Sequence, residues 1–220
     1  MAATRPTQAG SKKACAHPAA AVPGPRKIGL DLPRSIAFIN DLRRFGEKTL
    51  KLDFDASFRR YQPRYRTANW LYAAHPDRLS SALPGNALFQ FTWRLAEAQR
   101  WERHYRLRRR DTYLYSAEAH GGPACPMTPS LLAADPERRG YVVLHEAWHS
   151  TLRLSGVRMP YALEEATGRI VGLRGTTLFA EARGDAELVR AARAQERAWL
   201  LFARFINRNY RRLARIYRDR

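Results

Sequence analysis

The feature that most constrains the fold of this chain is the five-residue motif His145-Glu146-Ala147-Trp148-His149. Residues four apart lie on one face of an α-helix, so the two imidazoles of this motif can bind one cation if the segment is helical. Glu146 then lies about 100° round the helix from His145, where it can reach a water on that cation without crowding it. The motif therefore predicts a helix that carries most of a hydrolytic metal site.

The residues on either side predict where this helix begins and ends. Asp135-Pro136-Glu137 is typical of a helix start, with Asp as the N-cap, Pro at the first helical position and an acid in the first turn. Gly156 and Pro160 bracket the expected end. Three large apolar residues at four-residue spacing would form the back of the helix: Leu144, Trp148 and Leu152. The strict alternation that a strand requires is absent, so the segment is interpreted as an amphipathic helix.

A catalytic zinc site needs a third protein ligand and one open position for water, and the next segment supplies two candidate acids. Pro160 can open a second helix, which the preceding connection is long enough to fold back against the first. Glu165 is the favoured ligand, because Gly168 and Gly172 share its face and small residues allow two helices to approach closely. Glu164 lies on a neighbouring stripe and is expected to flank the site.

The ligand types also indicate which metal is bound and how it is used. Two imidazoles and one carboxylate with an open position suit Zn²⁺, although nickel, cobalt or iron could occupy the same ligands. Zinc would lower the pKa of its bound water toward about 7, and Glu146 would act as the general base. Oxyanion stabilisation needs a further donor, for which His120, Tyr115 and Tyr161 are candidates and His120 is preferred. The alternatives for these three are a surface His, a strand-packing Tyr and a helix-cap contact.

Together the motifs resemble those of the gluzincins, zinc peptidases that combine H-E-x-x-H with a glutamate on a following helix. More narrowly, they resemble a bacterial family of predicted aminopeptidases. Leu144–His149 is similar to that family's H-E-L-A-H segment, with Trp148 in place of a small residue. Glu164–Gly168 is similar to its N-E-A-x-A helix, and the resemblance implies that Glu165 is the third ligand independently of the packing argument.

The resemblance covers about residues 35 to 217 and is looser outside the metal motifs. Asn69–Ala74 and Asp111–Tyr115 resemble two of the family's strands. The chain departs from the family at Ala119–Ala124, where A-Y-S-T-L-G is usual and where His120 replaces a tyrosine. The Gly-rich Met-Glu-Asn loop with which well-known aminopeptidases bind a free α-amine is not found, so a metallopeptidase is supported by residues and an aminopeptidase by the family label.

The expected fold is α+β and zincin-like: a small sheet, the H-E-x-x-H helix, a crossing glutamate-bearing helix and a long C-terminal helix. Composition and periodicity divide the chain into a disordered Ala/Pro-rich tail (1–33), a metallopeptidase domain (34–184) and an Arg-rich C-terminal helix that packs on the domain (185–220). Within the domain, the expected elements are a helix at 33–50, strands at 70–74, 88–92 and 112–115, a helix at 93–107 and a Pro-rich loop before the metal helix.

The net charge of +19 raises the question of a polyanionic partner. Five of the 39 basic residues are Lys, so 39 − 5 = 34 are Arg. Such a field attracts nucleic acid and anionic lipid, yet no zinc-finger, RRM or KH motif is present, so no specific nucleic-acid binding is expected. The Arg and Ala bias is equally consistent with a biased genome. Two alternatives to the peptidase stay open: a basic module that binds nucleic acid or acidic partners, and a zinc-stabilised scaffold without turnover.

The remaining expectations concern location and assembly. Cys15 and Cys125 form no disulfide framework, the N-terminal tail has no signal-peptide apolar stretch, and no run of 18 apolar residues occurs. The chain is therefore expected to be cytoplasmic, without a membrane span, and to act on a peptide substrate. In the resembled family the C-terminal region usually continues as a helical hairpin. Here the sequence stops at Arg220, so the second half of that hairpin is not expected. The apolar stripe from Leu188 to Ile216 would be left exposed and would favour a homodimer.

Overall fold

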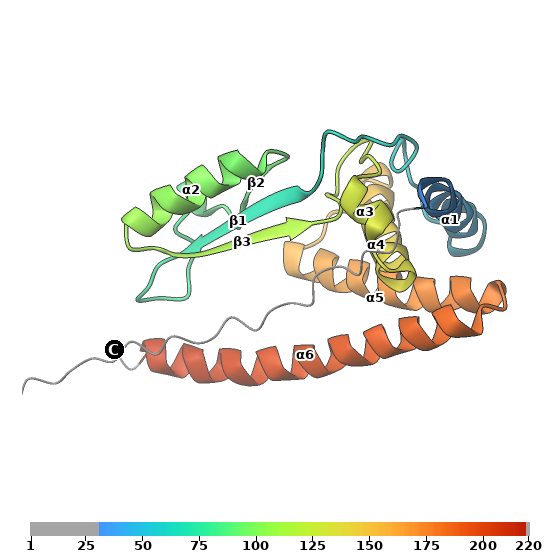
Figure 1. Ribbon diagram of the computed structural model, residues 1–220. Coiled ribbons are helices and arrows are strands. Elements are labelled where there is room, and N and C mark those ends of the chain that lie inside the picture. The colour runs from blue at the N-terminus through green and yellow to red at the C-terminus, as the bar shows by residue number, and fades with distance from the viewer. Residues whose placement is uncertain (1–30, 219–220) are drawn as a thin grey trace, which may run out of the picture.

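The structure is a computed structural model that describes residues 31–218. It is a mixed α/β fold in which a helical part and a small sheet lie side by side (Figure 1). Most of the expected N-terminal tail, including Cys15, lies outside the described residues, and Cys125 is buried with a free thiol. Among residues 31–218, no helix combines the length and apolarity needed to cross a bilayer.

The helical part is built round the helix that carries the H-E-x-x-H motif. That helix, α4 (Pro136–Leu154), packs most extensively against α5 (Tyr161–Ala182), and both contact the long helix α6 (Ala186–Arg218). Two further helices pack beside α4: α1 (Leu32–Phe45), which runs on into a π-helical turn (Gly46–Leu50), and the short α3 (Pro129–Ala133). The helix expected at 33–50 therefore consists of α1 and this turn, and α3 lies where a loop was expected.

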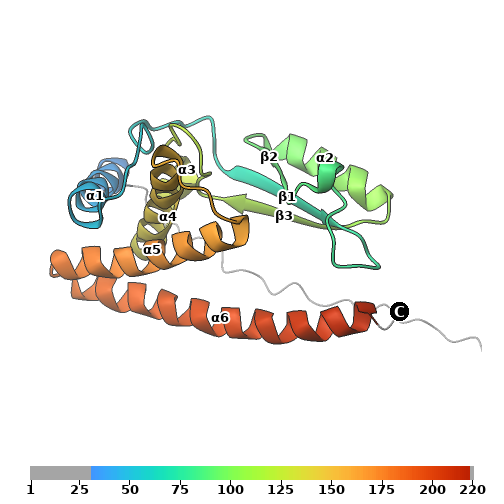
Figure 2. The ribbon, with the colours of Figure 1, turned by 180° about the vertical axis from the view of Figure 1, so that it is seen from behind.

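The sheet has three antiparallel strands in the order β2-β1-β3. Its strands are β1 (Ala68–Ala74), β2 (Gln90–Thr92) and β3 (Asp111–Ala117), so β2 is shorter than the expected strand at 88–92. Helix α2 (Leu95–Leu107) covers one face of the sheet (Figures 1 and 2). The N-terminal end of α5 lies on the side of the opposite face.

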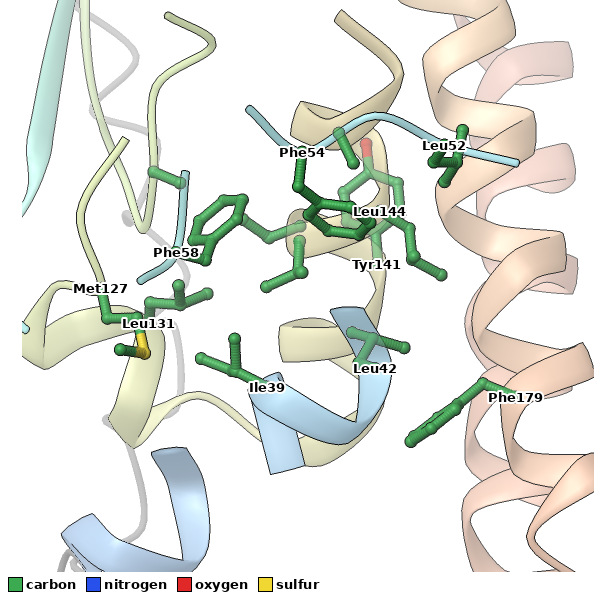
Figure 3. Packing of buried hydrophobic residues seen from close by; sticks show 14 of the residues in the cluster. Ile39, Leu42, Leu52, Phe54, Phe58, Met127, Leu131, Tyr141, Leu144 and Phe179 are labelled. Atoms are coloured by element: carbon green, nitrogen blue, oxygen red, sulfur yellow. The ribbon is translucent and has the colours of Figure 1, made fainter. Parts of the chain in front are cut away.

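The hydrophobic core lies in the helical part, around α4 (Figure 3). Its largest fully buried side chains come from α1, from the segment after the π-helical turn, from α3 and from α4: Ile39, Leu42, Phe54, Phe58, Leu131, Leu132, Val143 and Leu144. Leu144 and Val143 directly precede the H-E-x-x-H motif. The core therefore fixes the backbone of α4 at the turn where the motif begins.

Candidate metal centre

Close packing of α4 on α5 brings the predicted ligands together, and glycines make that packing possible. A Cβ at Gly172 would lie only 2.7 Å from the backbone oxygen of Tyr141, and a Cβ at Gly168 would lie 3.1 Å from Nδ1 of His145. Side chains of any size at these two positions would push the helices apart. The small residues expected on the ligand-bearing face therefore lie at the crossing itself.

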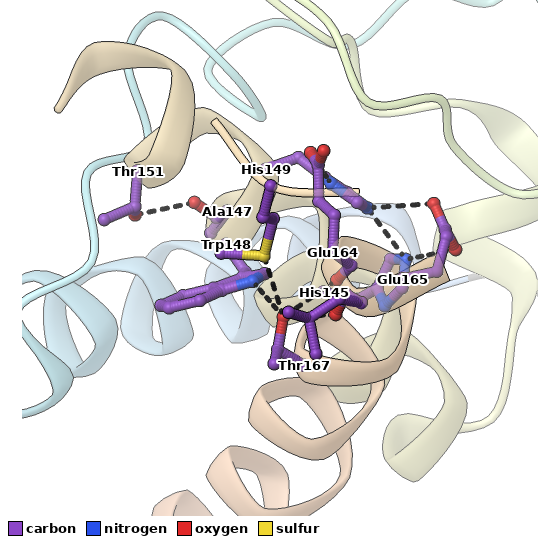
Figure 4. Close-up of polar contacts among 10 residues, drawn as sticks. His145, Ala147, Trp148, His149, Thr151, Glu164, Glu165 and Thr167 are labelled. Atoms are coloured by element: carbon purple, nitrogen blue, oxygen red, sulfur yellow. Dashed lines mark hydrogen bonds and ion pairs between the residues drawn. The ribbon is translucent and has the colours of Figure 1, made fainter. Parts of the chain in front are cut away.

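Three side chains at this crossing form a group that could hold a metal ion: His145, His149 and Glu165, whose ligand atoms all lie within 4.8 Å of one another (Figure 4). The Nε2 atoms of the two histidines are 3.1 Å apart. The Glu165 carboxylate faces both rings, with Oε2 at 3.6 Å from Nε2 of His145 and Oε1 at 3.4 Å from Nε2 of His149. These are the three residues that the sequence predicts as ligands.

The hydrogen bonding of this group fits a cation between the rings. Glu164 Oε1 is 2.7 Å from Nδ1 of His149, where a carboxylate accepts from Nδ1–H, and in the neutral ring of that tautomer Nε2 carries the lone pair. That lone pair points toward Nε2 of His145 and toward Glu165, where a positive charge would satisfy all three. Glu164 was expected only to flank the site, and it contacts Nδ1 of His149, one of the three candidate ligands.

Electrostatics at the group favour the same conclusion. Burial lowers the pKa of His145, but the Glu165 hydrogen bond and the charge of Glu146 outweigh burial and leave that pKa raised. Burial raises the pKa of Glu165, but His145, His149 and Arg169 outweigh it and leave that pKa lowered. The carboxylates thus draw positive charge into the group, and a divalent ion would meet that demand better than one proton.

Glu146, the predicted base, lies under the loop that precedes α3. A Cβ at Gly121 would meet Oε2 of Glu146 at 2.7 Å and Cδ2 of His149 at 3.4 Å, so the loop backbone passes directly over the carboxylate. Burial raises the pKa of Glu146, and the charges of His145 and His149 oppose that rise only in part. A carboxyl with a raised pKa beside a candidate metal is suited to accept and return a proton.

The three predicted oxyanion donors are placed differently. The ring of His120 stacks on Phe91 at 3.9 Å, and burial, followed by the charge of His149, lowers its pKa to about 4, so it is neutral at pH 7. Tyr161 opens α5 and hydrogen-bonds Glu165; burial and that acid raise its pKa. The hydroxyl of Tyr115 accepts a hydrogen bond from Arg138 and has no hydrogen bond to the candidate ligands among those described.

Arg138 is a further residue of the site that the sequence did not single out. Its guanidinium binds both oxygens of Glu118, at 2.9 and 2.8 Å, and lies 5.1 Å from the ring centroid of Tyr141. Its charge also reaches Glu146 and lowers the pKa of that carboxyl, against the rise caused by burial. Its spacing in the sequence could have identified it, because Arg138 lies seven residues before His145 and therefore shares its helix face.

Fold and site together define a mixed α/β protein with a His-His-Glu group that could hold a metal ion beside a buried glutamate. The family model described as "Putative aminopeptidase" matches residues 26–220, which is most of the chain, so the protein belongs to this family. No curated protein and no solved structure matches the chain.

Proposed function

We propose that the protein is a zinc-dependent peptidase of the gluzincin type, with a zincin-like fold and His145, His149 and Glu165 as its metal ligands. The observation that carries this proposal is the convergence of these three side chains, from two helices, within 4.8 Å. The family description supports a peptidase, and specifically an aminopeptidase. The cation can be Zn²⁺ because the donor set of two imidazoles and a carboxylate is one that zinc prefers.

When bound, zinc would supply Lewis acidity toward the scissile carbonyl and would acidify a water molecule. Glu146 takes the proton from the attacking water and passes it to the leaving amine, a role that its raised pKa favours. Neutral His120 is our first candidate to donate a hydrogen bond to the developing oxyanion, and Tyr161 is the second, once its hydroxyl turns from Glu165 to the substrate. Glu164 holds His149 in the tautomer that leaves Nε2 free.

Metal analysis combined with Glu146→Gln tests this proposal. The purified protein is expected to contain one equivalent of zinc and to cleave peptides in a random library. Glu146→Gln should retain the metal and lose cleavage by at least about 100-fold, because the general base is removed while the ligands remain. Glu137→Gln, on the same helix but outside the site, is the matched control and should cleave like the wild type.

Other outcomes separate the alternatives. Metal in both proteins with no cleavage in either would indicate a metal-stabilised scaffold without turnover. Equal cleavage by wild type and Glu146→Gln would show that Glu146 is not the base. Protein that takes up no zinc, with steeply salt-sensitive binding to random duplex DNA, would replace the peptidase by a basic binding module.

A further inference from the structure

The face of the sheet opposite α2 is lined by aromatic rings. In the register of the sheet, Trp70 pairs with Phe91 on one side and with Tyr115 on the other, and Tyr72 pairs with Tyr113. These residues share one face because side chains alternate along a strand, and the intervening residues point toward α2. Phe89, directly before β2, adds a sixth ring, 4.3 Å from Trp70 and 6.1 Å from Tyr72 between centroids.

This aromatic face, defined as Trp70, Tyr72, Phe89, Phe91, Tyr113 and Tyr115, is open enough to bind a ligand. Tyr113 is 62% exposed, which is unusual for a large ring inside a regular strand. Helix α2 packs on the other side of the sheet (Figures 1 and 2). None of the six side chains carries a formal charge, so the face offers mainly apolar and π surface. Its polar groups are the indole nitrogen of Trp70 and the tyrosine hydroxyls, of which that of Tyr115 accepts a hydrogen bond from Arg138.

The aromatic face is continuous with the candidate metal centre at two points. Tyr161, which hydrogen-bonds Glu165, has its ring 6.1 Å from Phe89, and the charge of Glu165 reaches Tyr72. At the second point, His120 lies against Phe91 and 4.7 Å from Trp70. A ligand bound at the candidate metal centre could therefore place its adjacent side chain against the aromatic face.

Two unpaired ring nitrogens mark the junction between the aromatic face and the metal centre. Within residues 31–218, Nε1 of Trp70 and Nδ1 of His120 are buried and have no hydrogen-bond partner. The indole nitrogen of Trp70 is a donor, and Nδ1 of His120 donates or accepts according to its tautomer. Buried polar atoms without partners are costly, which indicates that polar groups of a ligand complete them. A donor and an imidazole nitrogen beside an apolar face match a peptide, which presents backbone carbonyl and N–H groups next to its side chains.

We infer that the aromatic face is the specificity subsite of the proposed peptidase and that it binds a large apolar or aromatic side chain next to the scissile bond. The position next to a cleaved bond rests on the proposed function, whereas binding of the side chain to the aromatic face does not. Electron-rich rings also attract cations, yet the net charge of +19 disfavours approach of a basic side chain. The neutral aromatic occupant is therefore the one that the charge and the surface together favour.

A peptide-library digest with the wild-type protein and three variants tests this inference. Mass spectrometry of the products reads the residues on both sides of every cut, so the preference is visible whichever end of a peptide is processed. Phe, Tyr, Trp and Leu should be enriched on one side of the cut. The ratio of kcat/KM for a Phe-containing peptide to that for its Ala counterpart should be at least about tenfold.

The variants locate the subsite. Tyr113→Ser and Phe89→Ala should each lower the Phe/Ala ratio several-fold, because each removes a ring from the aromatic face. Tyr105→Ser is the matched control: Tyr105 lies on α2, across the sheet from the aromatic face, and its loss should leave the ratio unchanged. Unfolding midpoints of all three variants show whether a lowered ratio reflects lost structure.

A binding measurement keeps the inference separate from the proposed activity. Calorimetry with the Glu146→Gln protein and the same Phe and Ala peptides should show tighter binding of the Phe peptide. If nothing is cleaved but the Phe peptide binds better, the peptidase fails and the subsite stands. Cleavage with no apolar preference, enrichment of Lys or Arg at the cut, or equal binding of both peptides would each overturn the subsite.

Discussion

At the scale of single residues, the close approach of Gly121 to Glu146 gives the sharpest prediction. Gly121→Ala places a Cβ only 2.7 Å from Oε2 of Glu146 and must displace either the loop or the carboxylate. Peptide cleavage should fall about 100-fold, because misplacing a reacting group by about 1 Å has that effect, while bound metal is retained. Gly122→Ala is the control, since its Cβ would meet nothing closer than His120 at 3.9 Å. Equal activity in the two variants would contradict this placement of Glu146.

His120 gives a second prediction at this scale, on stability at acid pH. Its pKa of about 4 in the folded protein lies below the ordinary value of 6.5, so the unfolded chain takes up the proton first. The contribution of neutral His120 is therefore complete above pH 6.5 and is lost as the pH falls toward 4. The loss should be about 2 kcal/mol, less than the full linkage value because the ring is only partly buried.

Urea unfolding at neutral and acid pH measures this loss. His120→Phe keeps an aromatic ring against Phe91 and removes the titration, so its free energy of unfolding should fall less on acidification than that of the wild type. His104→Phe replaces an exposed imidazole on α2 and should behave like the wild type. Identical acid sensitivity in wild type and His120→Phe would show that burial of His120 does not oppose its protonation.

At the scale of secondary-structure elements, the crossing of α4 and α5 decides whether the proposed metal ligands meet. Gly140→Ala and Gly172→Ala both place a Cβ into the crossing, but they meet different atoms: the Thr176 side chain at 2.6 Å and the backbone oxygen of Tyr141 at 2.7 Å. Each should lower the free energy of unfolding by about 1–3 kcal/mol, as overpacking does. Thr176→Ala should restore stability to Gly140→Ala, since the clashing atoms disappear.

No side-chain deletion can fully relieve Gly172→Ala, because its closest contact, at 2.7 Å, is with the backbone oxygen of Tyr141. Thr176→Ala should therefore leave the Gly172→Ala defect in place, and zinc affinity should fall with stability in this variant because the two helices carry different ligands. Thermal unfolding and metal titration of the single and double variants measure both effects. Rescue of both glycine variants by Thr176→Ala would show that the crossing is looser than the distances indicate.

The elements also show what the sequence could and could not predict. The H-E-x-x-H helix was predicted correctly, because Asp135 and Pro136 are local signals, and α4 begins at Pro136 with Asp135 at the N-cap position. The hydrogen bond between Glu164 and His149 was not predicted, because it depends on the angle at which α5 crosses α4. Likewise, α3 is too short for its periodicity to stand out against three nearby prolines.

The aromatic face is a clearer example of a feature that the sequence alone could not predict. Trp70, Phe91 and Tyr115 are far apart in the sequence, and only the register of the three strands places them in one row. The predicted strands were correct in kind, but a register cannot be derived from one strand at a time. His120 could be identified as a candidate because it replaces a tyrosine of the resembled family, whereas its aromatic surroundings could not be predicted.

At the scale of the whole molecule, net charge and exposed apolar surface have opposite effects on the association of two copies of the chain. The outer half of α6 carries large exposed apolar side chains, among them Phe205 at 60% and Ile216 at 45%, so association of two copies through α6 is our expectation. The charge of +19 repels a second copy, and salt screens that repulsion. The dimer fraction in sedimentation experiments should therefore rise with salt, while non-specific binding to duplex DNA should fall.

The role of Phe205 in this association can be tested against Leu107, an even more exposed apolar residue outside α6. Phe205→Glu places a charge in the apolar stripe of α6 and should keep the protein monomeric at every salt concentration. Leu107→Glu changes an 86% exposed leucine at the end of α2 and should leave the dimer fraction as in the wild type. A wild-type protein that stays monomeric in high salt would show that +19 charges are not what keeps two copies apart. The apolar stripe of α6 would then be too weak, or too far from flat, to bind its own copy.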